Sequence, residues 1–274
     1  MDTNTQTPSV TQAPTSLSTQ SLISILALGA TLGLVAAPAQ AAPESLKTAT
    51  PVSLSPTPSA ELLAEGRRVR LHAIRLYHAR ELLGRAYKSS IVKATEATKD
   101  VESFVLATVR KSLPEAWKKD SERVSRAILA QSIEHGFDPI FLISVMRTES
   151  SFRPEMVGGV GEIGLMQVRP ETAAWIAKKI GYTRYAGRAS LFDPVVNIEI
   201  GAAYFAMLRQ NFDDDGQLYI SAYNMGTTSV RRALANSKRP SEYSGRVLSH
   251  YRELYRSFAP SYAVSRVNRK VAMN

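Results

Sequence analysis

The sequence predicts an all-α, mainly helical protein. Apolar residues recur at helical spacing in most segments after residue 60, and alternating strand patterns are almost absent. Start and stop signals agree, since Gly136 can end one helix, Asp138 can cap the next and Pro139 suits its first position. We therefore expect helices at 119–135, 139–150, 170–180, 194–212, 217–224 and 241–257.

The N-terminal residues 1–41 have the pattern of an export signal. Residues 22–37 form an apolar run, and residues 39–41 (AQA) offer a small-residue cleavage site. Residues 1–21 contain no Lys or Arg, so a retained membrane anchor is an alternative, although the run is short for a full span. The absence of Cys excludes a lipoprotein anchor and disulfides. The predicted location is the periplasm or the cell envelope.

Two segments of different composition precede the main helical region. Residues 42–59 are rich in Pro, Ser, Thr and Ala and are typical of a flexible linker. Residues 60–115 are predicted as a helical accessory region, with a hairpin packed on the main region favoured over a partner-binding arm or a coiled segment. Its apolar sets are Leu62, Leu63, Val69, Ile74, Leu76, Leu82 and Leu83, then Val101, Phe104, Val105, Val109 and Leu113. The main region spans 116–262, and 263–274 is a basic tail.

The chain is basic, with 34 Lys and Arg against 24 Asp and Glu, a net charge of +10. This balance suits nucleic acid, anionic lipid or an acidic wall polymer. The sequence contains no dedicated nucleic-acid motif, so nucleic acid is not an expected partner. Export favours the wall polymer, and membrane association would depend on residues 22–37 being retained. We expect a monomer.

No metal and no cofactor are predicted. Residues 211–216 are similar to the start of a calcium-binding loop, but Ala222 stands where a bidentate acid is needed. The four histidines lack metal-ligand spacing: His72, His78, His135 and His250.

Glu149 is the candidate catalytic residue. Steps of three, four and seven residues back along its helix reach Met146, Val145 and Leu142, so Glu149 ends an apolar stripe. Apolar neighbours and the negative end of the helix dipole both disfavour a carboxylate, so we expect a raised pKa. A carboxyl that keeps its proton near neutral pH can act as a general acid. On the helix alone, a solvent-facing Glu is the simpler alternative.

Further blocks follow in order and favour the catalytic interpretation. They are 149–154 (ESSFRP), 161–167 (GEIGLMQ), 191–194 (LFDP) with 197–204 (NIEIGAAY), and 221–226 (SAYNMG). Together these blocks resemble the soluble lytic transglycosylase family, whose relatives include goose-type lysozyme. The resemblance covers about residues 117–260, with Tyr243 as a weaker echo.

The resemblance implies a lysozyme-like helical catalytic domain that acts on the glycan strands of peptidoglycan. Glu149 would protonate the oxygen between N-acetylmuramic acid and N-acetylglucosamine, then deprotonate the muramic 6-hydroxyl, which closes a 1,6-anhydro ring. No second protein carboxyl is needed. The implied substrate-binding residues, with ordinary loop and helix-end hydrogen bonding as the alternative, are Ser150, Met166, Gln167, Tyr223, Asn224 and Tyr243.

Three residues depart from the family pattern, which usually has Ser at position 158, Ala at 162 and often Met at 169. This chain has Gly158, Glu162 and Arg169. Glu162 could be a solvent-facing loop residue, a base or a substrate contact. Arg169 could pair with Glu162 or Glu171, or contact an acidic stem peptide. Two other functions therefore stay open: a goose-type muramidase that uses water, and a wall-binding or assembly protein without activity.

Overall fold

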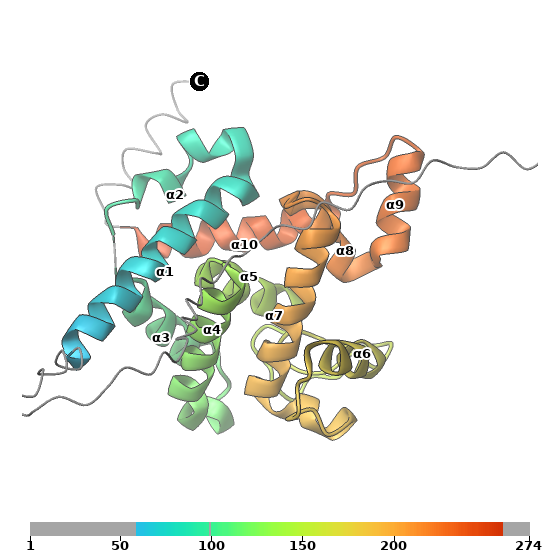
Figure 1. The fold of residues 1–274 in the computed structure, drawn as a ribbon, viewed down its shortest axis with the longest axis horizontal. Helices are drawn as coiled ribbons and strands as arrows, with labels where there is room; N and C mark the ends of the chain where they lie inside the picture. The colour runs from blue at the N-terminus through green and yellow to red at the C-terminus, as the bar shows by residue number, and fades with distance from the viewer. Residues whose placement is uncertain (1–58, 99, 260–274) are drawn as a thin grey trace, which may run out of the picture. The chain divides into compact units, whose positions relative to one another are not determined.

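The computed structural model describes residues 59–98 and 100–259, and this part of the chain is helical (Figure 1). Its only extended pairings are isolated β-bridges, so the all-α prediction is confirmed. None of the described helices has the length and hydropathy of a membrane span. The predicted signal or anchor, the linker up to residue 58 and the basic tail lie outside the described residues.

The six predicted helices are all present, with ends that lie within two residues of the predicted positions. Helix α9, the short α2 and the 3-10 turns are not predicted, because they bury few apolar side chains; α9 buries Val230 alone. The elements in chain order are α1 (Ala60–Leu83), η1 (Gly84–Ser89), α2 (Ile91–Ala94), α3 (Val101–Ser112), η2 (Glu115–Asp120), α4 (Ser121–His135), α5 (Pro139–Glu149), α6 (Pro170–Ile180), η3 (Arg188–Phe192), α7 (Pro194–Asn211), α8 (Gly216–Met225), α9 (Thr227–Ala235) and α10 (Glu242–Phe258).

Helix α5 is buried along most of its length, from Pro139 to Met146, and it packs against α10, α4 and α3. A helix that is apolar on all sides is stable only inside a core. Its predicted start is confirmed, since the Asp138 carboxylate accepts the Ile140 N–H at 2.9 Å and Gly136 ends α4 with a φ of 70°. The core therefore fixes α5, and Glu149 is its last residue.

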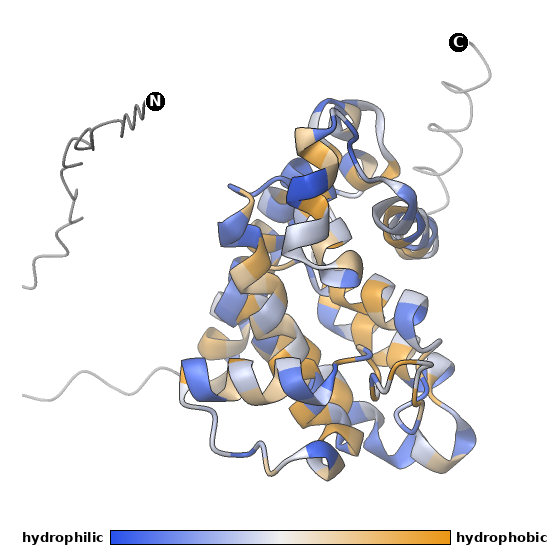
Figure 2. Cartoon of the chain, turned by 90° about the vertical axis from the view of Figure 1, so that its right-hand side faces the viewer, coloured by the Kyte–Doolittle hydropathy of each residue, from blue (hydrophilic) through white to orange (hydrophobic). Residues whose placement is uncertain are grey.

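Helices α1 and α3 share one hydrophobic core with the helices after residue 115. Leu71, Leu82, Val105 and Val109 are buried in it, and α1 contacts α4 and α8. Along most helices, hydrophilic and hydrophobic residues alternate (Figure 2). The first turns of α1 differ from the sequence pattern, because Leu62, Leu63 and Val69 are exposed. The division at residue 115 into an accessory region and a catalytic domain stays a prediction.

A buried polar network joins α1 to the start of α5 and to α10. The hydroxyls of Tyr251 and Tyr255 on α10 donate to Asp138 Oδ2 at 2.6 and 2.5 Å. The Asp138 N–H donates to His78 Nδ1 at 3.0 Å, and Arg75 Nη1 lies 3.4 Å from the Tyr255 hydroxyl. Because buried polar groups are costly unless paired, this network specifies how α1 sits on α5 and α10.

Candidate active site

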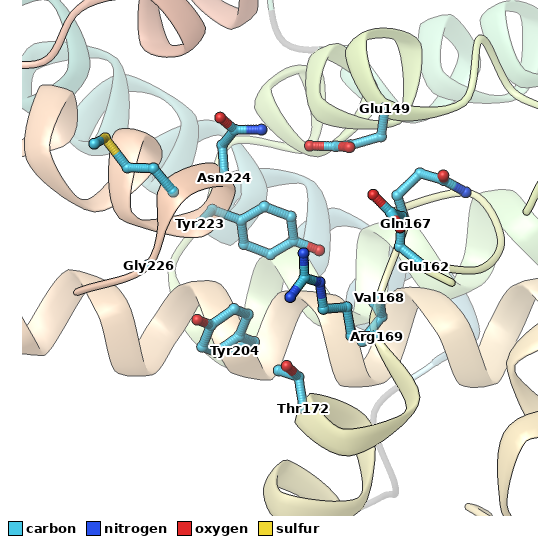
Figure 3. Close-up of a pocket in the computed structure, with 11 residues that line it drawn as sticks. Glu149, Glu162, Gln167, Val168, Arg169, Thr172, Tyr204, Tyr223, Asn224 and Gly226 are labelled. Atoms are coloured by element: carbon cyan, nitrogen blue, oxygen red, sulfur yellow. The ribbon is translucent and has the colours of Figure 1, made fainter. Parts of the chain in front are cut away.

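A cavity of about 320 Å³ opens beside the C-terminal end of α5 (Figure 3). Glu149 lies on one side, the loop between α5 and α6 supplies Glu162 and Gln167, and α8 supplies Tyr223 and Asn224 (Figure 3). The full lining is Glu149, Glu162, Gln167, Val168, Arg169, Thr172, Tyr204, Tyr223, Asn224, Met225 and Gly226. Most of these residues are polar, as a site for a hydroxyl-rich ligand requires.

Glu149 is in the protonation range of a general acid. Burial raises its pKa from 4.5 to about 7, and the nearby Glu162 carboxylate acts in the same direction. The hydroxyl of Tyr243, which donates to Glu149 Oε1, and the charge of Arg246 lower the pKa. The predicted upward shift is confirmed, and desolvation is its main cause.

The loop that follows Glu149 turns at once. Ser151 and Phe152 have φ values of 51° and 62°, a left-handed conformation that non-glycine residues seldom adopt. Phe152 is buried, so its side chain anchors the turn. The Ser150 hydroxyl lies 2.9 Å from the Leu165 carbonyl oxygen and holds the two ends of the loop together. The turn thereby directs the chain across the pocket.

Asn197 on α7 holds the central part of this loop. Its side-chain oxygen accepts the Met166 N–H at 2.7 Å, and its amide nitrogen donates to the Ile163 carbonyl at 2.8 Å. Gly164 lies against it with a φ of 81°, and a β-carbon there would stand 2.8 Å from the Leu191 carbonyl oxygen. Glycine is therefore required at this close approach.

Tyr223 closes the opposite side of the pocket. Its hydroxyl donates to the Met166 carbonyl at 2.8 Å, and its ring stacks on Phe205 with centroids 4.0 Å apart. Burial raises the pKa of Tyr223 well above its ordinary value, so the hydroxyl keeps its proton. Helix α8 and the loop are thus joined across the floor of the pocket.

Comparison with known proteins identifies a family that this part of the chain resembles. Residues 126–244 match the family described as the transglycosylase SLT domain, and this range includes Glu149, Gln167, Tyr223 and Tyr243. This segment is therefore similar to the SLT domain family. A membrane-bound lytic murein transglycosylase C from Shigella sonnei (strain Ss046) is 34% identical over 134 residues, which are 46% of this chain and 37% of that relative.

Two solved structures are also similar. The 70 kDa soluble lytic transglycosylase of Escherichia coli has a TM-score of 0.46 and 24% identity, covering 63% of this chain and 32% of its own. An inactive mutant of the lytic transglycosylase Slt from Pseudomonas aeruginosa has the same TM-score and identity, covering 73% and 34%. This chain therefore spans about a third of the length of the relatives it matches.

Within the matched segment 126–244, the structure brings Gln167, Tyr223 and Asn224 to the pocket with Glu149. Tyr243 lies behind Glu149 and contacts it rather than the cavity. The side-chain nitrogen of Gln167 donates to the carbonyls of Met156 and Gly164, at 3.1 and 2.9 Å. Its side-chain oxygen is therefore the group left for a ligand.

Ser150 and Met166 are not among the residues that line the pocket. Both are buried, and Met166 packs on Gly201 of α7. Their positions beneath the loop differ from the predicted contact with the sugar. Ser150 follows the end of α5, where a polar side chain satisfies free backbone groups. Met166 is the apolar side chain that anchors the loop in the core.

The two charged departures from the family pattern both line the pocket. Glu162 is half-buried, and its Oε2 accepts the Val160 N–H at 3.0 Å. Arg169 is exposed, and within the described part of the chain it forms no ion pair with Glu162 or Glu171. A cation and an acid thus line the same pocket without forming a direct ion pair.

Several residues of the site were not predicted from the sequence. Tyr204 and Thr172 line the cavity, Arg246 acts on the charge of Glu149, and Asn197 shapes the loop. Asn197 and Tyr204 stand in a block that resembles the family, and a buried Asn in an apolar helix was the available signal. Arg246 had no such signal, because its effect depends on how α10 packs.

The acids of the rejected calcium loop are turn and cap residues. Asp215 accepts the Leu218 N–H at 3.1 Å, and its carboxylate pairs with Arg239. Asp213 and Asp214 form the turn before α8 with positive φ. Among the described residues, no cluster of three His, Cys, Asp or Glu could hold a metal ion.

Proposed function

We propose that this chain is a peptidoglycan lytic transglycosylase, with Glu149 as its catalytic acid and base. One observation carries the proposal: a half-buried carboxyl with a pKa of about 7 lines a polar pocket in the segment that matches the SLT domain. Near neutral pH, such a group can both give and accept a proton.

In the first step, the Glu149 proton passes to the oxygen that links N-acetylmuramic acid to N-acetylglucosamine, and the bond to the anomeric carbon breaks. Glu149 is then a carboxylate, which the Tyr243 hydroxyl and the Arg246 charge stabilise. In the second step, this carboxylate takes the proton of the muramic 6-hydroxyl, whose oxygen bonds to the anomeric carbon. The ring closes without water, and Glu149 is again protonated.

Tyr223, Asn224 and the side-chain oxygen of Gln167 are the groups that we assign to the sugar. They come from two elements, α8 and the loop between α5 and α6, and they line the cavity together with Glu149 (Figure 3). Positioning of this kind supplies much of the rate of a reaction between bound groups.

We also propose an exported protein of the periplasm or cell envelope. The apolar run 22–37 supports this location, and the Shigella relative is named as membrane-bound. Fractionation of cells that produce the full chain, beside a chain without residues 1–41, tests it. Recovery of both forms in the cytoplasm would contradict export.

A muramidase is the second candidate, and the position of Glu162 favours it. Glycoside hydrolases generally use two carboxyls, and Glu162 lines the same pocket as Glu149. Mass spectrometry of digested peptidoglycan separates the candidates. Anhydromuropeptides support the lytic transglycosylase, reducing muropeptides support the muramidase, and no release supports a wall-binding protein.

Substitution Glu149→Gln tests the mechanism. The amide cannot transfer a proton, so we expect release of muropeptides to fall by at least about a thousandfold. Sedimentation with insoluble peptidoglycan should still show binding, and the circular dichroism spectrum should be unchanged. Glu155→Gln, an exposed acid outside the pocket, is the matched control. Normal turnover by Glu149→Gln would reject the mechanism.

A further inference from the structure

Gly158 and Glu162, both departures from the family pattern, occupy the same space. A β-carbon on Gly158 would stand 2.5 Å from Cγ and 2.6 Å from Cδ of Glu162. Real side chains do not approach so closely, so any larger residue at 158 would displace the Glu162 side chain. The space that a β-carbon would fill at position 158 holds the Glu162 carboxyl group. We call this space the seat.

The backbone around this seat is held in place. The Gly158 N–H donates to the Glu162 carbonyl at 2.8 Å, and Val157 and Ile163 form an antiparallel bridge beside it. The Val160 N–H donates to the Glu162 carboxylate at 3.0 Å. The acid is therefore folded back over its own loop and held at a defined place on the pocket wall.

The Glu162 carboxylate shares the cavity with Glu149 and acts on its proton affinity. The other groups that act on Glu149 come from separate elements. Tyr243 and Arg246 of α10 favour the carboxylate, and the hydroxyl of Tyr223 of α8 interacts with it electrostatically. Glu162 is the acidic member of this set, since like charges disfavour each other's ionised forms.

We propose that Gly158 and Glu162 act as a pair, in which Gly158 leaves room for a second carboxylate on the pocket wall and that carboxylate adds to the effect of burial in keeping the proton on Glu149. Glu162 is then a positioning residue for the proton and leaves catalysis to Glu149. The inference rests on the proposed function. It explains why the two departures occur together: Ser at 158 would displace the Glu162 carboxyl group, and Ala at 162 would leave the space beside Gly158 without that group.

The first test is the pH profile of kcat/KM for Glu162→Gln. Without the neighbouring negative charge, Glu149 loses its proton more easily, so the alkaline limb should move down by roughly half to one pH unit. Glu155→Gln removes an equal charge outside the pocket and should leave the limb in place. If the alkaline limb of the Glu162→Gln profile stays where it is in the parent, the proposed pairing of Gly158 and Glu162 is overturned.

The second test uses the seat itself. Gly158→Ala leaves Glu162 chemically intact but displaces its carboxylate, and should move the limb down as Glu162→Gln does. Gly158→Ser with Glu162→Ala restores the usual family residues and fills the seat. The remaining close contact of a β-carbon there is 2.7 Å to the side-chain oxygen of Gln167, the end of a flexible side chain. We expect this double variant to fold and turn over with a lowered limb; a limb like that of the parent would overturn the proposal.

A third measurement separates this inference from the proposed function. Nuclear magnetic resonance of glutamate labelled with ¹³C at Cδ follows the Glu149 titration without turnover, with Glu149→Gln assigning the signal. A lower midpoint in Glu162→Gln supports the pair even if the protein releases no anhydro product. An unchanged midpoint overturns it. Reducing ends that the parent forms and Glu162→Gln lacks would also overturn it, because Glu162 would then be the base for water.

Discussion

At the scale of single residues, Glu149 stands between opposing influences. Burial and Glu162 favour its protonated form, whereas Tyr243 and Arg246 favour the carboxylate. The proposed mechanism requires both forms in turn, so neither influence can dominate. A pKa of about 7 satisfies this condition near neutral pH.

Tyr243→Phe removes the hydroxyl that donates to Glu149. The hydrogen bond stabilises the carboxylate, so its loss raises the pKa of Glu149, and the alkaline limb of kcat/KM should move to higher pH. This direction is opposite to that for Glu162→Gln. Tyr251→Phe is the matched control, because it removes a buried hydroxyl of the same helix that donates to Asp138. A downward shift in Tyr243→Phe would contradict the assignment.

Glu149→Gln should also change the pH dependence of stability. The pKa of Glu149 in the folded protein, about 7, lies above the ordinary value of 4.5. Between these values the folded protein keeps a proton that the unfolded chain releases, so the parent loses stability as the pH rises. Relative to acidic pH, the variant should gain about 2 to 3 kcal/mol over the parent above neutral pH. Urea unfolding across the pH range measures this difference, and parallel curves would contradict it.

At the scale of elements, the site depends on how the loop between α5 and α6 is held. Helix α5 presents the acid, α7 holds the loop through Asn197, and α8 holds it through Tyr223. The loop supplies Glu162 and Gln167 to the cavity. Helix α5, directly before the loop, and two helices later in the chain therefore shape this segment together.

Asn197→Ala should disturb this loop. The substitution leaves the Met166 N–H and the Ile163 carbonyl without partners in a buried site. We expect a loss of about 2 to 3 kcal/mol in the free energy of unfolding, measured with urea, and a lower turnover even where the protein is folded. Asn211→Ala, an exposed residue of the same helix, should stay within about 0.5 kcal/mol of the parent. Equal effects of the two variants would remove the special role of Asn197.

At the scale of the whole described molecule, the helices before residue 115 and those after it form one core. The buried polar groups of α1 contact α5, α8 and α10: Arg75 reaches Tyr255, and His78 reaches both Asp138 and Tyr219. Because α5 carries Glu149 at its other end, α1 contributes to the support of the site.

Arg75→Met tests this support. Arg75 is fully buried and donates to the Thr98 carbonyl at 2.8 Å, and its charge lowers the pKa of the buried Asp138 against the larger effect of burial. Its removal should cost about 3 kcal/mol in the free energy of unfolding, with a single transition in urea. Arg70→Met changes an exposed Arg of the same helix and is the control. A second transition for residues 60–115 would show that they fold independently.

The main helices could be predicted from the sequence because their signals are local. The Asp138 cap, the Gly136 stop and the apolar period of α5 act within a few residues of each other. Prediction of the site from the sequence was less complete. Ser150 and Met166 belong to the resembling blocks yet support the loop from beneath, whereas Arg246 has no local signal and acts on Glu149.

The sequence by itself determined the all-helical class and the ends of the main helices, and it indicated Glu149 as the candidate acid, because caps, periodicity and motif order are properties of neighbouring residues. The tertiary structure alone decided which side chains meet. Burial, the Tyr243 hydrogen bond and the place of Glu162 set the pKa of Glu149. The seat at Gly158 exists because glycine has no β-carbon, and only the packing shows that the Glu162 side chain fills this space.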